Sequence, residues 1–174
     1  MNILAGKFKG RNIKTSFKLP YRPTKSRVRK SIFDSLNPFS YASALDLFSG
    51  SGIFGFEAAS RGADSVTFVE RHHTTFSLIK ENAELLSGPN YYFYKKDVFS
   101  FLNGQESYDL IFADPPYDEY DLKSLSQTAL EHLNKKGKFI LECDKRQVAF
   151  LNASVKDYGK TRILYWEKVW ERSF

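Results

Sequence analysis

The tetrapeptide Asp114-Pro115-Pro116-Tyr117, which follows the apolar run "YDLIFA", has residue types suited to chemistry on an amino group. Asp114 offers a carboxylate. The carbonyl of Pro115 is a second hydrogen-bond acceptor whose direction Pro116 helps to fix, because a residue before proline is held in extended backbone. Two such acceptors could hold both N–H bonds of an amine, and Tyr117 could stack on a base. The plainer alternative is a strand that ends at Pro-Pro, with Asp114 as a turn former.

A glycine-rich turn follows an earlier apolar run. In "LDLFSGSGIFGFEA" an acid in the strand is followed by three glycines and a helical pattern. Such a turn at the carboxyl end of a parallel strand lets backbone amides approach a ligand closely. The spacing also satisfies GxGxxG, so a dinucleotide-dependent oxidoreductase has to be weighed, and a tight strand-to-helix turn is the simplest alternative. The cofactor contacts predicted in this turn are Asp46, Phe48, Ser49, Gly50, Ser51 and Gly52.

Acids at the ends of further strands make the pattern more specific. Glu70 ends the second strand, where a carboxylate can accept both hydroxyls of a ribose. Asp97 ends the third strand, where it could accept from an adenine amine beside a wall formed by Val98. With the glycine turn, these residues predict a pocket for S-adenosylmethionine, whose sulfonium would supply the reactive carbon without a metal or a cysteine nucleophile. The cofactor residues predicted here are Glu70, Arg71, Asp97, Val98 and Asp114.

A parallel sheet would position these residues at one edge. Short β-rich apolar runs alternate with amphipathic segments, which predicts a doubly wound α/β domain. The last two runs, 153–160 and 161–170, have no helix between them and predict an antiparallel hairpin at the edge of the sheet. The five earlier strands are expected at 43–48, 65–70, 91–97, 108–113 and 138–143.

Helices are expected between the strands and before the first one. The inter-strand helices should begin near Ile53, Thr74 and Glu119, with Gly62 and Gly88 as C-terminal stops. In the N-terminal region, "RPTKSRVRKSIFDSL" predicts a further helix with Thr24 as a credible N-cap. The apolar face of that helix would consist of Val28, Ile32, Phe33 and Leu36.

The charge of the chain is concentrated at its N-terminus. Residues 1–30 contain ten of the 26 basic residues and no acid, which leaves 16 bases against all 20 acids in the rest. This asymmetry is expected of a protein that contacts a polyanion such as nucleic acid. A solvated surface helix or tail is the alternative. The RNA contacts predicted from this region are Lys7, Lys9, Arg11, Arg22, Lys25, Arg27 and Arg29.

Composition excludes several other classes. The 174 residues, 42% of them apolar, are enough for one domain with a core. No run approaches the roughly 20 apolar residues of a membrane span and no secretory signal is recognisable, so we expect a cytoplasmic protein. Cys143 as the single cysteine excludes an internal disulfide, and the three histidines lack metal-binding spacing, so we expect no metal. Nothing in the sequence demands more than a monomer.

The motifs together resemble a known family. "DLFSGSG" and "DPPY", with Glu70 and Asp97, are similar to the class I methyltransferases that modify exocyclic amines. "LAGKFKGRNI" followed by "RPTKSRVRKSIFDSL" is more specific, because it resembles the N-terminal part of the bacterial RsmD-type small-subunit ribosomal RNA guanine-N2 methyltransferases. The resemblance runs over nearly the whole chain.

This resemblance implies a fold, a reaction and a partner. The fold would be Rossmann-like, with seven mostly parallel strands, an antiparallel C-terminal hairpin and a basic N-terminal extension. The reaction would transfer a methyl group from S-adenosylmethionine to the N2 amine of a guanine in 16S rRNA, within a partly assembled small subunit. The RNA-contacting arm and helix would span residues 1–40 and the methyltransferase domain residues 41–174. The catalytic residues would be Asp114, Pro115, Pro116 and Tyr117.

Other functions remain open on the sequence alone. An oxidoreductase leaves "DPPY" without a role. Amine methyltransferases that act on DNA adenine or on protein glutamine are closer alternatives. DNA adenine enzymes usually carry an additional target-recognition domain, and glutamine enzymes generally have Asn at the position of Asp114, so RNA is favoured. A non-enzymatic RNA-binding module would have no use for a cofactor pocket.

Overall fold

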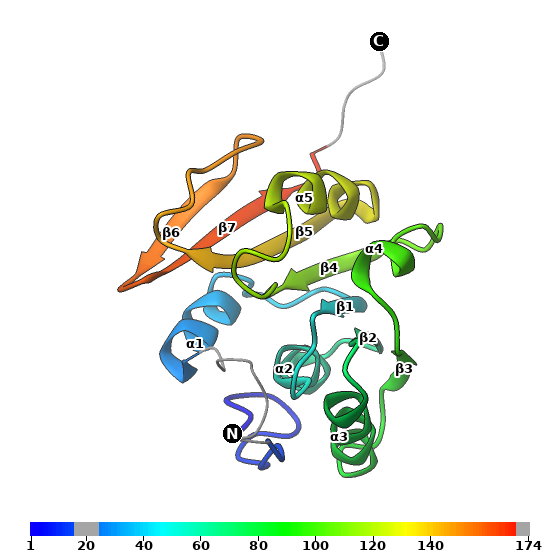
Figure 1. Ribbon diagram of the computed structural model, residues 1–174. Coiled ribbons are helices and arrows are strands. Elements are labelled where there is room, and N and C mark those ends of the chain that lie inside the picture. The colour runs from blue at the N-terminus through cyan, green and yellow to red at the C-terminus, as the bar shows by residue number, and fades with distance from the viewer. Residues whose placement is uncertain (16–24, 170–174) are drawn as a thin grey trace.

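The computed structural model describes residues 1–15 and 25–169. Across its sheet the strands lie in the order β3, β2, β1, β4, β5, β7, β6 (Figure 1). The first five of these are parallel, whereas β7 is antiparallel to both β5 and β6. The predicted fold class is therefore confirmed, including the C-terminal hairpin. The bounds are β1 (Ser43–Leu47), β2 (Ser65–Val69), β3 (Asn90–Tyr94), β4 (Tyr108–Ala113), β5 (Leu133–Asp144), β6 (Ser154–Tyr158) and β7 (Thr161–Glu167).

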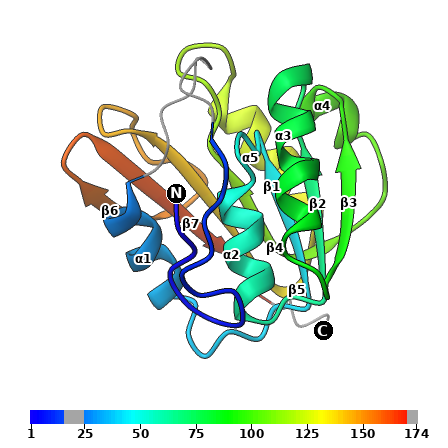
Figure 2. The same ribbon diagram turned by 90° about the horizontal axis from the view of Figure 1, so that it is seen from below.

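Helices cover both faces of the sheet. Their bounds are α1 (Ser26–Asp34), α2 (Ile53–Arg61), α3 (His73–Glu84), α4 (Val98–Phe101) and α5 (Leu122–Glu131). Figures 1 and 2 show α1, α2 and α3 on one face and α4 and α5 on the other. Along β1 the pleat sends Ala44 into the core under α2 and Leu45 into the core under α5. The strands β1, β2 and β4 are thus buried on both faces, as parallel strands usually are.

The strand register brings the predicted site residues to one edge. Leu47 at the end of β1 lies opposite Val69 of β2 and Ala113 of β4. The chain leaves β1 toward β2 on one side, while β4 lies on the other side. This reversal of strand order opens a crevice beyond the carboxyl ends of β1 and β4, where open α/β sheets bind ligands.

Several element boundaries differ from those expected. β3 ends at Tyr94 rather than at residue 97, because Asp97 caps the short helix α4, which the sequence did not predict. α5 begins at Leu122, capped by Asp121, and not near Glu119. α2 ends at Arg61, and Gly62 follows as the predicted C-terminal stop, with a φ of 122° that is readily available only to glycine.

Other differences concern the ends of longer elements. α3 ends at Glu84, before the expected stop at Gly88. β5 begins at Leu133 rather than at residue 138, and its pairing with β4 shifts register at the start. The N-terminal helix begins at Ser26, and the predicted cap Thr24 lies outside the described residues.

The N-terminal segment packs against the helical layer. Ile3, Phe8 and Ile13 are buried in the same core cluster as α1 and α2. Figure 2 shows this segment running beside α2, and the backbone N–H of Phe8 donates to the hydroxyl of Ser60 in that helix at 2.8 Å. None of the helices in the described part of the chain is long and apolar enough to cross a membrane.

Candidate cofactor and substrate site

The glycine turn joins β1 to α2 in a tight left-handed path. Phe48, Gly50 and Gly52 all have positive φ, at 57°, 54° and 79°. Gly55, in the first turn of α2, packs directly on β2: a Cβ at this position would lie 2.3 Å from the ring of Phe68. Close packing of this kind draws the start of the helix toward the sheet, so that the turn lies at the edge of the crevice.

Asp46 supports the turn from below. Its carboxylate is buried and accepts the backbone N–H of Gly55 at 3.0 Å, one of the N-terminal amides that α2 cannot satisfy itself. Burial raises the pKa of the Asp46 carboxyl well above its usual range, and the neighbouring charge of Glu70 adds to this. Asp46 does not line the cavity, and the contact that the structure shows for it is this support of the turn. Its predicted cofactor contact stays a prediction.

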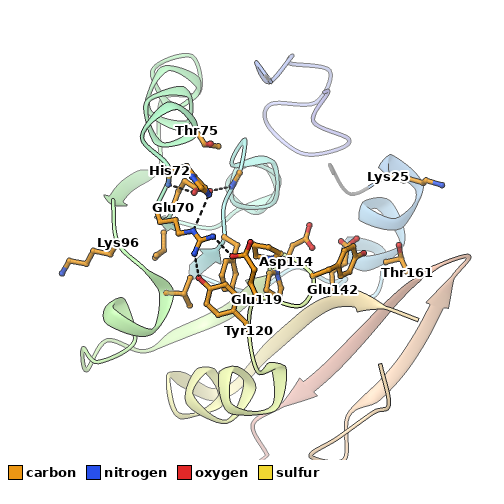
Figure 3. A pocket seen from close by; sticks show the side chains of 18 residues that line it. Lys25, Glu70, His72, Thr75, Lys96, Asp114, Glu119, Tyr120, Glu142 and Thr161 are labelled. Carbon is orange, nitrogen blue, oxygen red and sulfur yellow. Dashed lines mark hydrogen bonds and ion pairs between the residues drawn. The ribbon is translucent and has the colours of Figure 1, made fainter. Parts of the chain in front are cut away.

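A cavity of about 340 Å³ occupies the crevice, a volume within the usual range for small-molecule sites. In Figure 3, Lys96 lies on one side of it and Lys25 and Thr161 on the opposite side, with Asp114 and Glu142 between them. Ser49, Ser51, Gly52 and Asp97, predicted as cofactor contacts, are not in its lining. Those predicted residues that do line it are Phe48, Gly50, Glu70, Arg71, Val98, Asp114, Pro115, Pro116 and Tyr117.

The carboxylate of Glu70 is held by two backbone N–H groups. One of its oxygens accepts the N–H of Gly50 at 3.0 Å and the other accepts the N–H of His72 at 2.9 Å. An ionised carboxylate has about four acceptor positions, so two further hydroxyl donors can still bind. This is the acceptor set that the two hydroxyls of a ribose require.

Tyr120 lines the cavity at the centre of a cluster of hydrogen bonds. The Tyr120 hydroxyl donates to Asp97 at 3.0 Å and accepts from Arg71 at 3.2 Å, while Arg71 also pairs with Glu119. The Tyr120 ring packs edge-on against Phe48, with centroids 4.8 Å apart. Burial, followed by the hydrogen bond to Asp97, raises the pKa of Tyr120 to about 12, so the hydroxyl stays protonated as a donor.

The predicted catalytic tetrapeptide begins immediately after β4. Asp114 is half-buried, Pro115 is buried, and the side chain of Tyr117 is 53% exposed at the rim. A second cavity of about 380 Å³ lies on the other side of the tetrapeptide and shares Pro115, Pro116, Tyr117, Tyr120 and Glu142 with the first. Residues 114–117 therefore lie between two cavities, where the flat ring of a base could enter beside Tyr117.

The basic N-terminal region presents part of its charge to solvent. Lys7, Lys9, Arg11, Lys25 and Arg27 are exposed, as an RNA contact requires. Lys25 also lines the cavity, at the start of α1. Arg22 lies outside the described residues.

The predicted RNA contact of Arg29 is wrong, because the side chain of Arg29 is fully buried. It donates to the backbone carbonyl of Asn2 at 2.7 Å and lies 3.8 Å from Glu57. Glu57 in turn accepts from Arg61 at 2.9 Å and from the backbone N–H of Leu4 at 2.9 Å. Arg29 thus attaches the N-terminal segment to α1 and α2, and it cannot reach RNA in this fold. Burial lowers its pKa.

Sequence reasoning missed several cavity residues. Tyr120 lies only three residues beyond "DPPY", and its aromatic character was the available signal. Glu142 was not predicted as a site residue, although it lies near the end of β5 at the same edge as the other acids. The remaining missed lining residues are Val69, His72, Thr75, Lys96, Glu119 and Thr161.

Comparisons with known proteins agree with this architecture. The family model described as "Conserved hypothetical protein 95" matches residues 1–167. YlbH of Bacillus subtilis (strain 168), named "Putative rRNA methyltransferase", is 34% identical over 182 residues, which cover 97% of this chain and 99% of YlbH. "Ribosomal RNA small subunit methyltransferase D" of Buchnera aphidicola subsp. Acyrthosiphon pisum is 37% identical over 153 residues, covering 83% of this chain and 78% of that protein. The solved structure "Putative methyltransferase yhhF from Escherichia coli" superposes with a TM-score of 0.85 at 25% identity, covering 97% of this chain and 98% of that one.

The seven-stranded sheet, the glycine turn and the cavity beyond β1 and β4 define a class I methyltransferase, whose cofactor is S-adenosylmethionine. The chain belongs to the family described as "Conserved hypothetical protein 95". The resemblance to RsmD-type proteins that the motifs indicated is confirmed.

Proposed function

We propose that this protein transfers a methyl group from S-adenosylmethionine to the exocyclic N2 amine of a guanine in 16S rRNA. The observation that carries the proposal is the position of Asp114, half-buried in the wall of the cavity directly beyond β4 and next to the glycine turn. Relatives named as ribosomal RNA methyltransferases support the substrate class.

The residues of the cavity fit the cofactor. Glu70 has two acceptor positions left after its two backbone bonds, which suits the ribose hydroxyls. Val98 is buried and lines the same cavity, where it forms an apolar wall for the adenine ring. When bound, S-adenosylmethionine supplies an electrophilic methyl carbon on its sulfonium.

The side chains beyond β4 act on the nucleophile. The lone pair of an exocyclic amine is delocalised into the base, so the nitrogen is a poor nucleophile until its N–H bonds are held out of the ring plane. The carboxylate of Asp114 and the carbonyl of Pro115 accept these two N–H bonds, and Pro116 keeps the carbonyl direction fixed. The Asp114 carboxylate can also take the proton that the nitrogen loses. Tyr117, exposed at the rim, stacks on the base.

The N-terminal region supplies the RNA contact in this proposal. Residues 1–40 contact the RNA and residues 41–174 form the methyltransferase domain, although residues 1–15 pack into the common core. The exposed cations Lys7, Lys9, Arg11, Lys25 and Arg27 attract phosphates without reading sequence. The RNA within a partly assembled small subunit is the natural substrate, and the enzyme acts as a monomer.

Methyl transfer from labelled S-adenosylmethionine tests the proposal. The substrates are naked 16S rRNA and partly assembled small subunits from cells lacking this enzyme, and digestion to nucleosides identifies the product. We expect label in N2-methylguanosine. Label recovered only in N6-methyladenosine, or only in protein, would refute the proposed substrate.

A further inference from the structure

Glu142 lies next to Asp114, near the end of the neighbouring strand β5. The register pairs Ala113 of β4 with Leu141 of β5, so Asp114 and Glu142 are the next residues on adjoining parallel strands. Such strands are about 4.8 Å apart. Figure 3 shows the two carboxylates on the same wall of the cavity, and Glu142 also lines the second cavity.

The side chain of Glu142 is buried, since the residue is only 6% exposed. A ligand that places a hydrogen-bond acceptor against a buried carboxylate binds poorly, because the interior offers no water to separate the two acceptors. An ionised carboxylate can only accept hydrogen bonds. Glu142 therefore favours any ligand that presents an N–H or O–H donor at this point.

The nucleobases differ at the ring position beside their amines. The N6 amine of adenine is next to the ring acceptor N1, and the N4 amine of cytosine is next to the ring acceptor N3. The N2 amine of guanine is different, because one of its two flanking ring nitrogens, N1, carries a hydrogen and donates, while the other, N3, is an acceptor. Proteins that extrude a base into a pocket commonly recognise it by hydrogen bonds to its Watson–Crick edge, which carries these groups.

We propose that Glu142 accepts the N1–H of the target guanine while Asp114 accepts from its N2 amine. Two neighbouring carboxylates then match two neighbouring donors, and Glu142 selects guanine over adenine and cytosine, whose amines have no ring N–H beside them. This inference rests on the proposed function and explains its choice of base. Tyr117 holds the ring plane against the same wall.

A base analogue tests this role directly. 2-Aminopurine keeps an exocyclic amine at position 2 but has a bare N1, which is an acceptor, and a hydrogen in place of the O6 carbonyl, so the contact at N1 is read from the change of the guanine preference in a Glu142 variant. Ligated RNAs carry guanine or 2-aminopurine at the methylated position, and the single-turnover transfer rates at saturating cofactor give a selectivity ratio. We expect the wild type to prefer guanine by at least about 100-fold, since sites built to bond a substrate N–H reject analogues that lack it.

The variant Glu142→Gln should change this ratio, because its amide can donate to the bare N1 of 2-aminopurine. We expect the preference for guanine to fall at least about tenfold while cofactor affinity stays within a few fold. Glu167→Gln is the matched control. It makes the same chemical change at an exposed position of β7, in a residue outside the cavity lining, and should leave the ratio unchanged.

The outcomes separate this inference from the proposed function. An unchanged ratio in a Glu142→Gln protein that still binds cofactor would overturn the role of Glu142, even if the wild type makes N2-methylguanosine. If Glu142→Gln fails to fold, a wild-type preference for guanine over 2-aminopurine below about threefold would equally overturn the role of Glu142. Failure of the wild type to methylate guanine in any RNA would instead overturn the proposed function.

Discussion

Replacing Arg29 with Met should destabilise the protein without weakening its binding to RNA. Arg29 is fully buried, donates to Asn2 and lies 3.8 Å from Glu57. Breaking a buried ion pair usually costs about 3–5 kcal/mol, because the other charge is left in the interior. Arg61 remains 2.9 Å from Glu57 and compensates part of that charge, so we expect a loss near 3 kcal/mol. For a domain of this size, this corresponds to a decrease in Tm of about 6–12 °C.

Arg27→Met is the matched control, two residues away on the same helix and exposed. Thermal unfolding followed by circular dichroism should show a change below about 0.5 kcal/mol for Arg27→Met. In RNA binding measured over a salt series, Arg27→Met should have the larger effect and Arg29→Met the smaller one. Arg27→Met should reduce the slope of log affinity against log salt by about one, and Arg29→Met should leave it unchanged. Equal Tm values for the two variants would refute the buried-pair reasoning.

Three further predictions follow from side chains around the cavity and core. Tyr120→Phe removes the hydroxyl that donates to Asp97, and calorimetry should show an about tenfold weaker affinity for S-adenosylmethionine; an unchanged affinity would mean that this hydroxyl does not order the cofactor site. Asn82→Leu removes a fully buried amide that forms hydrogen bonds with Lys14 of the N-terminal segment and with the carbonyl of Ser51. Urea unfolding should show that the free energy of unfolding falls by about 3 kcal/mol, and a fall below about 1 kcal/mol would contradict this role. Burial raises the pKa of the Cys143 thiol to about 12. Labelling with a thiol reagent at pH 8 should therefore be at least about 100-fold slower in the native protein than in urea. Comparable labelling rates would show that the thiol is not buried.

The strand ends of the site could be predicted from sequence because they are marked locally. Gly50 and Gly52 interrupt an apolar run, and Pro115 and Pro116 end another, so each break places an acid at the same edge of a parallel sheet. Parallel strands that are buried on both faces read as continuous apolar runs, which made the sheet easy to recognise. The aromatic run at residues 91–94 alternates between partly buried and exposed positions along β3.

The residues that were misjudged depend on contacts between distant segments. Arg29 was assigned to the charged face of α1 because a helix by itself does not reveal a buried partner 28 residues away in Glu57. Asp97 ends β3 in the sequence pattern, but its carboxylate caps α4 and binds Tyr120, which arrives from the loop after β4. Glu142 gains its place beside Asp114 only through the order of strands in the sheet.

The proposed reaction requires that Asp114 acts on the amine and not on the cofactor. The decisive measurement is the single-turnover rate of methyl transfer by Asp114→Ala at saturating S-adenosylmethionine, compared with its cofactor affinity by calorimetry. We expect transfer to fall by at least about 100-fold while the affinity stays within a few fold of the wild type, because an acceptor aimed at the nucleophile contributes to the rate and little to cofactor binding. A parallel loss of affinity and rate would contradict this role and make Asp114 a residue that shapes the cofactor pocket.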